Sequence, residues 1–508
     1  MRISHGKIPI LAAAACLATM LSAQQTTPPA PSDSAAEQAA APENAAPAHA
    51  NSKVRIVRLS EVKGDVQLDR STGQGFEQAI ANIPIIENAR LQTATGAAEV
   101  EFEDNSTLRV GPDSLVVFPQ LEMTPAGIKI STIAVQQGMV YVSLLNSKDD
   151  FTVTFGQQRV HLDPSSHIRL QIDQNQARLA VFDGSAKVEG PSGTMEAAKK
   201  KTLVFNLADP SAPVVAKNNS SDPFDSWDHD SADYHKRYAA QAAVASSGYS
   251  YGGSDLSYYG AFVNGSCGSM WQPYFVSAGW DPFANGAWAY YPGAGYSWVS
   301  PYPWGWTPYH SGTWVSCPGM GWGWMPGSDW NGLGNQPTAI GAGGQPVQPV
   351  KPPAKSSGAR GFVVVNTKPL AVSTHGTGDS FVFRRDSAGF GVPRGSLGKL
   401  DGFSRDAVHH GSTSIPVFSP GFGMGQNSAR VAQAGVVQSP RVGMAPSSTW
   451  GAANGSMGSS MERPATGGTP TGYGHPSMGA SGAPAGAAPS TGGISMGSRG
   501  GGGGASPK

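Results

Sequence analysis

The sequence predicts a mainly β protein, in which a β-sandwich or β-roll is followed by a module of β-hairpins, with one short helix between them and long disordered segments. Three observations lead to this fold class. Apolar and polar residues alternate repeatedly over residues 53–207, which is the period of half-buried strands. Ten of the twelve tryptophans lie between Trp271 and Trp330. Glycine and proline contribute 66 and 40 of the 508 residues, above average usage, which indicates long linkers and tails.

The first 23 residues have the features of a signal peptide. Arg2 and Lys7 precede an apolar stretch over residues 8–21, and Leu21-Ser22-Ala23 ends in a small residue that suits cleavage. An apolar run of about 14 residues is too short to span a bilayer comfortably. We therefore expect an exported protein, periplasmic or extracellular, without a transmembrane helix in the mature chain.

Two further features belong to this N-terminal part. Lipid attachment at Cys16 is not expected, because Ala13 stands where a larger aliphatic residue is usual. Residues 24–52 are rich in alanine and proline and show no apolar period, so they are interpreted as a disordered spacer.

The clearest strand signals within residues 53–207 are hairpins. In residues 99–103, Glu-Val-Glu-Phe-Glu, the two apolar residues share one face, and the three glutamates are expected to face solvent. The turn Asp104-Asn105 then leads into Leu108-Arg109-Val110, and Asp183-Gly184 makes a second two-residue turn. No long helical pattern intervenes, so we expect one antiparallel β-sandwich or β-roll of about 150 residues.

Three segments of this domain share a pattern with a known family: Gly64-Asp65-Val66, residues 86–93 and residues 98–110, with weaker ones at 140–142 and 151–153. They resemble the FecR family, which shows a G-x-V opening, a G-x-x-L-x-T-G middle and an F-x-D-G-S-x-L-R-L hairpin. The resemblance covers about residues 55–190 and implies a β-rich extracytoplasmic module for binding or scaffolding. Signalling members of the family also have a cytoplasmic anti-sigma segment and a membrane helix, which have no counterpart in this sequence, so their regulatory role is not expected to carry over.

The chain departs from the family pattern at Asn88, Ala94 and Asn105, where the family usually has glycine or another small turn residue. Asparagine tolerates the left-handed backbone conformation better than most residues. We therefore expect Asn88 and Asn105 to preserve the turns.

Residues 217–247 predict a helical connector. Five aspartates precede His235, Lys236 and Arg237, and this order complements a helix dipole, so we expect a helix from about Phe224 to Ala245. The aspartates could instead suggest calcium. The central glycine and the glutamate at the twelfth position of a calcium-binding loop are both missing, which favours the dipole interpretation.

Residues 248–332 form the tryptophan-rich module, which contains an internal repeat. Residues 280–288 and 306–314 both read W-x-P-[FY]-x-x-G-x-W. Aromatic residues favour strands, and the proline and glycine between them fall at turn spacing. This pattern predicts a ladder of short hairpins. With Asp255-Leu256 before it, the segment also resembles a Trp-rich module that commonly follows a FecR domain and has no assigned activity.

The aromatic residues allow three interpretations. Their rings could pack on one another as a core, they could stack on sugar faces as a glycan-binding surface, or they could insert into a membrane surface. We expect packing for the segment as a whole, because it holds more rings than one groove needs. Membrane insertion lacks a supporting amphipathic helix or basic cluster. The candidate ligand-binding rings are Trp280, Trp288, Trp306, Tyr309 and Trp314.

Cys267 and Cys317 bracket most of the tryptophan-rich window and are the two cysteines that remain after signal cleavage. In an oxidising compartment such a pair is a disulfide candidate, the alternative being two separate buried thiols. We expect the disulfide.

The remaining residues predict little regular structure. Residues 333–360 are interpreted as a linker, residues 361–440 as a weakly ordered segment with short strands at 361–365 and 380–385, and residues 441–508 as a disordered Gly/Ser-rich tail.

No catalytic motif, cofactor motif or strong metal site is present in the sequence. His161 and His167 flank Asp163 and could bind a metal, but solvated side chains are the preferred interpretation. Lysine plus arginine equals aspartate plus glutamate, 35 each, so there is no basic field for nucleic acid. We expect a non-enzymatic binding or scaffolding protein whose partner is an envelope polysaccharide, such as peptidoglycan, or an envelope protein. The alternative is a regulatory or sensory accessory protein without the cytoplasmic anti-sigma segment.

Overall fold

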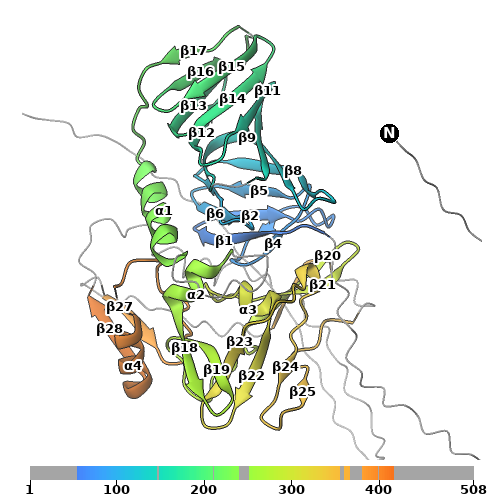
Figure 1. Cartoon of the computed structure of the whole chain (residues 1–508), viewed down its shortest axis with the longest axis vertical. Helices are drawn as coiled ribbons and strands as arrows, with labels where there is room; N and C mark the ends of the chain where they lie inside the picture. Colours follow the sequence, from blue (N-terminus) through green and yellow to red (C-terminus); the bar gives the residue numbers. More distant parts are fainter. Residues whose placement is uncertain are drawn as a thin grey trace, which may run out of the picture. The chain divides into compact units, whose positions relative to one another are not determined.

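The computed structural model describes residues 54–416, except for 146–147, 210, 240–250, 355–359, 366–379 and 399. The expected signal peptide, the expected spacer and the expected tail lie outside the described residues. The chain divides into two units, Met1–Ser439 and Pro440–Lys508, and every described residue belongs to the first. This part is mainly β, as the sequence predicts (Figure 1).

The N-terminal region is built from strands β1 to β17 (Figure 1). The strands are Val57–Lys63 (β1), Val66–Asp69 (β2), Glu77–Gln78 (β3), Pro84–Ile85 (β4), Arg90–Thr93 (β5), Ala97–Glu101 (β6), Thr107–Val110 (β7), Leu115–Met123 (β8), Lys129–Ser143 (β9), Asp150–Phe155 (β10), Gln158–Leu162 (β11), His167–Asp173 (β12), Gln176–Asp183 (β13), Ser185–Gly190 (β14), Gly193–Ala198 (β15), Thr202–Asn206 (β16) and Val214–Ala216 (β17).

The long strand β9 takes part in two sheets. Its first half pairs with β8 and β10, and its second half pairs with β7 and β12. At the change between sheets Gly138 has a φ of 87°, and its backbone lies so close to Ser114 that a side chain would overlap it, so only glycine fits. Strands β9 and β10 are parallel, because the chain returns from the end of β9 to run beside its first half. This parallel pair corrects the expectation of a wholly antiparallel domain.

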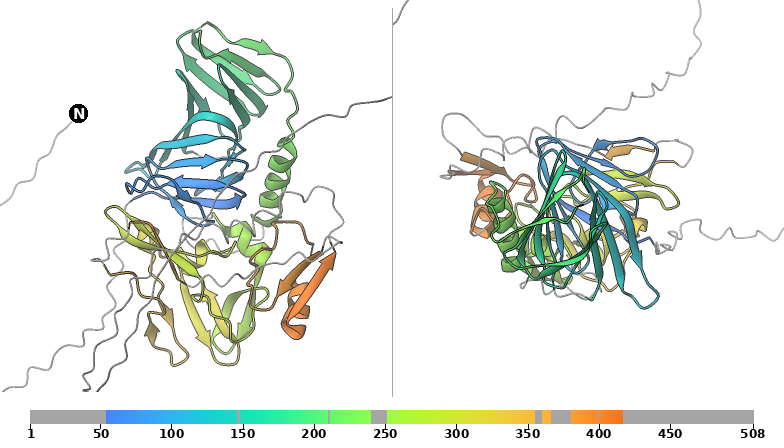
Figure 2. Two further views of the ribbon diagram at one scale, coloured as in Figure 1. Left: turned by 180° about the vertical axis from the view of Figure 1, so that it is seen from behind. Right: turned by 90° about the horizontal axis from the view of Figure 1, so that it is seen from above.

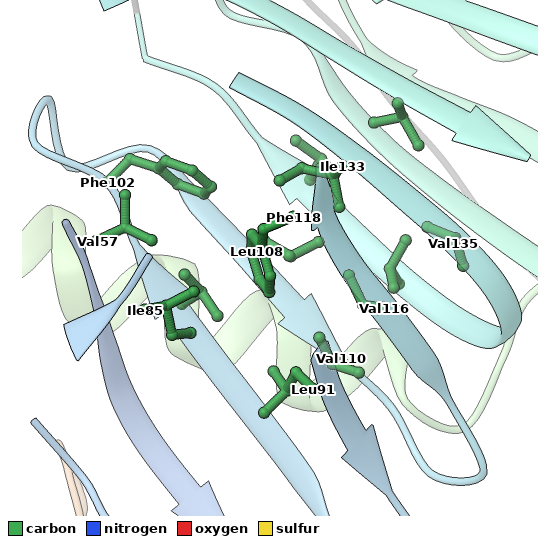
Figure 3. Close-up of a cluster of buried hydrophobic side chains, with 14 of the residues drawn as sticks. Val57, Ile85, Leu91, Phe102, Leu108, Val110, Val116, Phe118, Ile133 and Val135 are labelled. Atoms are coloured by element: carbon green, nitrogen blue, oxygen red, sulfur yellow. The ribbon is translucent and has the colours of Figure 1, made fainter. Parts of the chain in front are cut away.

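The alternating apolar residues form the core of this region. Val100 of β6, Leu108 and Val110 of β7 and Phe102 are all buried. Figure 3 shows Phe102, Leu108 and Val110 among the clustered apolar side chains. The inward face of the β6–β7 hairpin is therefore the one that the sequence predicts.

The expected tight turns are also present. Asn88 and Asn105 have φ values of 65° and 67°, in the left-handed region, so asparagine supplies the geometry for which the FecR pattern usually has glycine. Gly184 has a φ of 69° in the turn between β13 and β14. These two strands pair with other strands and not with each other, so the hairpin expected at Asp183-Gly184 is not formed. The Asn105 turn does join two paired strands, β6 and β7, and it fixes their register.

Helix α1 (Asp225–Ala239) is the expected connector and begins one residue after the expected start at Phe224. The rest of its expected length, up to Ala245, lies outside the described residues. A second helix, α2 (Gly253–Tyr259), was not expected, because this stretch was assigned to hairpins.

The tryptophan-rich region contains three hairpins, β18–β19, β20–β21 and β22–β23. The first and third belong to one sheet and the second belongs to another, so they do not form the single ladder that the repeat suggested. The elements are Gly260–Gly265 (β18), Gly268–Pro273 (β19), Gly286–Tyr291 (β20), Gly295–Val299 (β21), Thr307–His310 (α3), Thr313–Cys317 (β22) and Gly321–Met325 (β23).

The repeated unit W-x-P-[FY]-x-x-G-x-W is not itself a hairpin. In each copy it is a turn that leads into the first strand of a hairpin. In the first copy the Asp281 side chain accepts a hydrogen bond from the Phe283 backbone N–H at 2.8 Å. In the second copy the turn is the short helix α3, with Pro308 in its first turn, where proline is well tolerated.

Residues beyond the tryptophan-rich region add further structure. The stretch 333–360, which was expected to be a linker, contributes two strands, and β24 pairs with β22. Strand β26 pairs with β20, and helix α4 lies against the β27–β28 hairpin in both views (Figures 1 and 2). Strands β26 and β27 confirm the short strands expected at residues 361–365 and 380–385, whereas helix α4 was not expected. The elements are Gly332–Gly334 (η1), Ala339–Ile340 (β24), Pro346–Val347 (β25), Phe362–Val365 (β26), Ser380–Arg384 (β27), Leu400–His410 (α4) and Ser412–Pro416 (β28).

Across the described residues, no helix combines the length and the apolar character needed to cross a membrane.

Candidate functional site

The glutamates of β6 are buried, which corrects the expectation that they face solvent. Glu99 and Glu101 have no exposed surface and Glu103 has 3%. They do point away from Val100 and Phe102, as strand alternation requires. Glu99 contacts His235 of α1, and Glu101 accepts a hydrogen bond from the Gly252 backbone N–H just before α2. Glu103, which follows β6, pairs with Arg55.

Glu99 is the centre of this buried charge network. Its Oε1 accepts hydrogen bonds from His235 Nε2 and Arg394 Nη1 at 2.8 Å each, and from the Ser60 hydroxyl at 2.8 Å. Its Oε2 accepts one from Arg109 Nε at 2.8 Å. Burial alone would raise the pKa of Glu99, but the positive charges of His235, Arg109 and Arg394 outweigh it and hold that pKa well below its usual range.

Asp255 of α2 is the second centre. Its Oδ2 lies 2.6 Å from Arg58 Nη2 and 2.7 Å from Arg394 Nη2, and its Oδ1 accepts a 2.7 Å hydrogen bond from the Tyr234 hydroxyl. Burial opposes ionisation, but Arg394 and Arg58 outweigh it and lower the pKa of Asp255. Arg58 of β1 also donates to Glu101 at 2.9 Å. The FecR-like strands and α2 are therefore joined by ion pairs.

Two aspartates of α1 have specific partners in addition to their favourable place at the helix start. Asp228 accepts a hydrogen bond from Arg109 at 2.8 Å and lies 2.8 Å from His167 Nε2. Asp225 accepts one from Arg169 at 2.5 Å. Neither contact was expected from the sequence, and each attaches the helix to the FecR-like strands.

The buried charge network contains four carboxylates and three guanidinium groups, with imidazole side chains beside them. His235 lies 2.8 Å from Glu99, and His167 lies 2.8 Å from Asp228. Burial lowers the pKa of His235, but the adjacent Glu99 carboxylate outweighs that effect and the net change in the pKa is upward. The acidic members are Glu99, Glu101, Asp228 and Asp255, and the basic members are Arg58, Arg109, Arg394 and His235.

We expect protein stability to fall at alkaline pH because of His235. A histidine whose pKa is raised on folding stabilises the fold fully below its unfolded pKa of about 6.5, and this contribution is lost as pH rises through the folded pKa. Urea unfolding measured from pH 6.5 upward should show this loss in the wild type, and the His235→Gln variant should lack it.

The buried His310 provides an internal contrast for that measurement. Burial lowers the pKa of His310 to about 4, so its contribution is lost as pH falls from about 6.5 towards 4. The two histidines therefore act in different pH ranges. Equal slopes above pH 6.5 for the wild type and His235→Gln would contradict the role given to His235.

A second set of contacts joins the FecR-like strands to the tryptophan-rich region. The Asn82 side-chain amide donates to the Tyr302 carbonyl at 2.6 Å, and the Tyr291 hydroxyl donates to the Pro84 carbonyl at 2.5 Å. Arg70 is fully buried, donates to the Tyr290 carbonyl and lies 5.4 Å from the centre of the Tyr291 ring. The two regions thus share a continuous polar and aromatic interface.

The five rings expected to bind ligand are buried, which corrects their assignment as a binding face. Their exposed fractions are 8% or less, so none offers a flat face to a sugar. They pack on neighbouring aromatic residues instead: Trp288 meets Trp298 across β20 and β21 with ring centres 5.2 Å apart. The packing interpretation therefore describes this segment. The five rings are Trp280, Trp288, Trp306, Tyr309 and Trp314.

Trp304 is the hub of this aromatic core, and the sequence did not single it out. It is fully buried, and its ring stacks on Tyr302 at 5.1 Å and lies 4.9 Å from Trp271. It also lies 6.1 Å from Trp280 and 5.9 Å from Trp314.

Cys267 and Cys317 are joined by a disulfide in the structure, with their Cα atoms 6.0 Å apart. The bond connects the turn between β18 and β19 to the end of β22. Mass mapping of a non-reduced digest of the purified protein should therefore recover the two cysteine peptides as one linked species. Two free thiols in the folded protein would refute the assignment.

The expected weak metal candidates are not brought together. His161 lies 3.1 Å from the Thr152 hydroxyl, whereas His167 is turned towards Asp228. Among the residues that the structure describes, no group of three or more histidine, cysteine, aspartate or glutamate side chains could hold a metal ion.

The network joins the FecR-like strands, helices α1 and α2 and Arg394 through buried ion pairs. Its central carboxylates are buried and saturated with charged donors, and charge-assisted hydrogen bonds of this kind are among the strongest in proteins. Sequence reasoning missed Arg394 and the charges of Asp255 and His235. The available signal was cross-strand charge complementarity: Arg58 lies opposite Glu101, and Glu99 lies opposite Arg109.

Comparison with known proteins agrees with the two-part organisation. Residues 89–187 match the family described as FecR protein, and residues 253–338 match a family of unknown function, DUF6600. No curated protein matches the chain. Three solved chains match.

Two of the solved chains are crystal structures, at 1.65 and 2.50 Å resolution, of a provisionally assigned anti-sigma factor from Parabacteroides distasonis, with sequence identities of 14% and 13%. Each covers 27% of this chain and 63% or 62% of its own, with TM-scores of 0.24 and 0.23. A TM-score this low is not evidence of shared function. The two family matches show that this chain carries a FecR domain followed by a DUF6600 region, and the buried charge network lies where the two meet.

Proposed function

We propose that this protein is a non-enzymatic binding or scaffolding protein of the cell envelope, exported to the periplasm or the cell exterior. The observation that supports this most directly is the buried charge network between the FecR domain and the DUF6600 region. Glu99, Asp255 and His235 are engaged by internal partners, and a satisfied network of this kind rigidifies the parts that it joins. A fixed geometry between two regions is what a scaffold requires.

The shape of the described surface supports binding on an exposed face. Two hollows on the described part of the chain have volumes of about 20 Å³ each, room for about one water. Small-molecule sites usually measure roughly 300–1,000 Å³. A surface with such shallow hollows suits a partner that contacts the protein over an extended area better than it suits a small substrate.

For the ligand we propose an envelope glycan, with one specific contact point. The second hollow is lined by Tyr309 and Trp314, two of the candidate rings, together with Asn331, Gln336 and Thr338. These three polar residues are partly exposed. Amide and hydroxyl groups beside aromatic edges can hold a sugar hydroxyl, although the buried rings cannot stack on a whole sugar face.

The test is co-sedimentation of the purified full chain with insoluble peptidoglycan. We expect the wild type to sediment with the polymer and the Gln336→Ala variant to lose much of that binding. Gln345→Ala is the matched control, because Gln345 is an exposed amide outside the hollow. No sedimentation of the wild type would overturn the peptidoglycan proposal, and equal binding by both variants would exclude the hollow as the contact point.

A regulatory accessory role is the second candidate, and the FecR match favours it. If the protein has this regulatory role, deleting its gene should change transcription from promoters that an extracytoplasmic sigma factor controls. Unchanged transcription, together with the absence of a sigma-factor gene beside this one, would count against that role and leave the scaffolding proposal standing.

A further inference from the structure

Residues 387–397, which we call the strap, lie along the DUF6600 region as a bound peptide would. The strap follows both family matches in the sequence. Its buried members include Ala388 and Val392, at 0% and 4% exposure. Three side chains donate hydrogen bonds to its backbone carbonyls: Trp304 to Ala388 at 2.7 Å, Tyr259 to Val392 at 2.7 Å and Tyr258 to Pro393 at 3.2 Å.

The strap carries a charged anchor, Arg394. Its Nη1 donates to Glu99 Oε1 at 2.8 Å, and its Nη2 donates to Asp255 Oδ2 at 2.7 Å and to the Ser60 carbonyl at 3.0 Å. The guanidinium carbon lies 5.4 Å from the centre of the Tyr234 ring. One planar cation thus bridges two carboxylates that belong to different regions of the chain.

The groups that hold Arg394 are positioned independently of it. Glu99 and Asp255 are each fixed by other partners, which come from strands β1 and β7 and from helix α1. Their positions are therefore set before the strap arrives, and such preorganisation favours binding. These partners are Arg109, His235 and Ser60 for Glu99, and Arg58 and Tyr234 for Asp255.

We propose that Glu99, Asp255, the Ser60 carbonyl and the Tyr234 ring form a binding site specific for a guanidinium group, and that Arg394 occupies this site as a replaceable intramolecular ligand. The site takes the arginine of a peptide or a free alkylguanidinium. It selects against an ammonium, because a lysine-like point charge lacks the planar fork that reaches both carboxylates at once.

Removal of the Arg394 side chain also leaves uncompensated negative charge at Glu99 and Asp255. Without Arg394, Glu99 and Asp255 each lose one cationic partner, and an unpaired buried charge is strongly unfavourable. An external guanidinium that enters the same position restores the balance. The uncompensated negative charge favours binding of a cation, and the planar arrangement of the guanidinium N–H groups makes the site specific for guanidinium.

The experiment is chemical rescue in the full chain. Arg394→Ala should lower the Tm, and adding methylguanidinium at near-saturating concentration should raise the Tm of this variant by about 3–5 °C. The wild type should not be stabilised, since its site is filled. Arg394→Lys should be intermediate without additive.

Two controls separate a specific site from a general cation effect. Methylammonium carries the same charge without the fork and should not rescue Arg394→Ala. Arg405→Ala removes an exposed arginine of α4 whose side chain is 76% exposed, and it should neither lose Tm nor respond to methylguanidinium. Equal rescue by both cations, or no greater shift in Arg394→Ala than in the wild type, would overturn the proposal.

If Arg394→Ala does not fold unaided, the test is its refolding from urea with and without methylguanidinium. Near-UV circular dichroism of the buried tryptophans measures the recovery. Recovery that requires methylguanidinium supports the site. No recovery with methylguanidinium at any concentration that the wild type tolerates overturns it.

Discussion

Replacing Glu99 by glutamine should lower the free energy of unfolding by about 3–5 kcal/mol, the usual cost of removing one partner from a buried ion pair. Glutamine keeps the shape of the side chain but removes the negative charge that His235, Arg109 and Arg394 share. Those three positive groups would then be buried with one anion fewer. The loss should appear in urea unfolding as a lower midpoint with a similar slope.

The control for this variant is Glu189→Gln. Glu189 is an exposed glutamate of β14 in the same domain, and it pairs with Lys187 at the surface. The substitution is chemically identical, so any difference between the two variants reports burial and not the loss of a carboxylate as such. A Glu99→Gln protein as stable as Glu189→Gln would show that the network does not hold the two regions together.

Truncating Trp304 to alanine should be comparably severe, with a loss of about 3–5 kcal/mol. Its indole fills the centre of the aromatic core, between Tyr302 and Trp271, and its N–H satisfies the Ala388 carbonyl of the strap. The variant would lose apolar contact, leave a cavity and leave a buried carbonyl without its donor. Trp304→Phe should cost less, because part of the ring volume is kept.

Thermal unfolding followed by far-UV circular dichroism measures this effect without relying on the deleted fluorophore. Phe262→Ala is a suitable control, because Phe262 of β18 is 43% exposed and its removal opens no cavity. If Trp304→Ala shifted the transition no more than Phe262→Ala does, the aromatic cluster would not be the core of the DUF6600 region.

The FecR domain could be predicted from the sequence because its determinants are local. Alternation assigned Val100 and Phe102 to the core, and short-range turn chemistry assigned the backbone conformation of Asn105. The same alternation placed Glu99 and Glu101 on the opposite face. It could not show what covers that face, because the covering helices lie more than 100 residues away in the sequence.

The aromatic segment was harder to predict because one residue pattern served two purposes. The spacing of Trp280 and Trp288 repeats at Trp306 and Trp314, and this repeat predicted a ladder of hairpins, whereas each copy in the structure is a turn before a strand. Aromatic content cannot distinguish an exposed face from a core, since the same rings suit both. The core interpretation became certain only with the neighbours in three dimensions, among them Trp304, which lies outside the repeat.

The position of Arg394 has a consequence for the order in which the polypeptide acquires its structure. Arg394 follows Glu99 by 295 residues, so at about 5–20 residues per second some 15–60 s of synthesis separate the two. The inner core of the FecR domain can form early, because its strands are close in sequence. Until the strap has been made, Glu99 and Asp255 each lack one of their cationic partners. We therefore expect this protein to fold in two stages. The FecR core forms first, and the binding of Arg394 then completes the buried charge network.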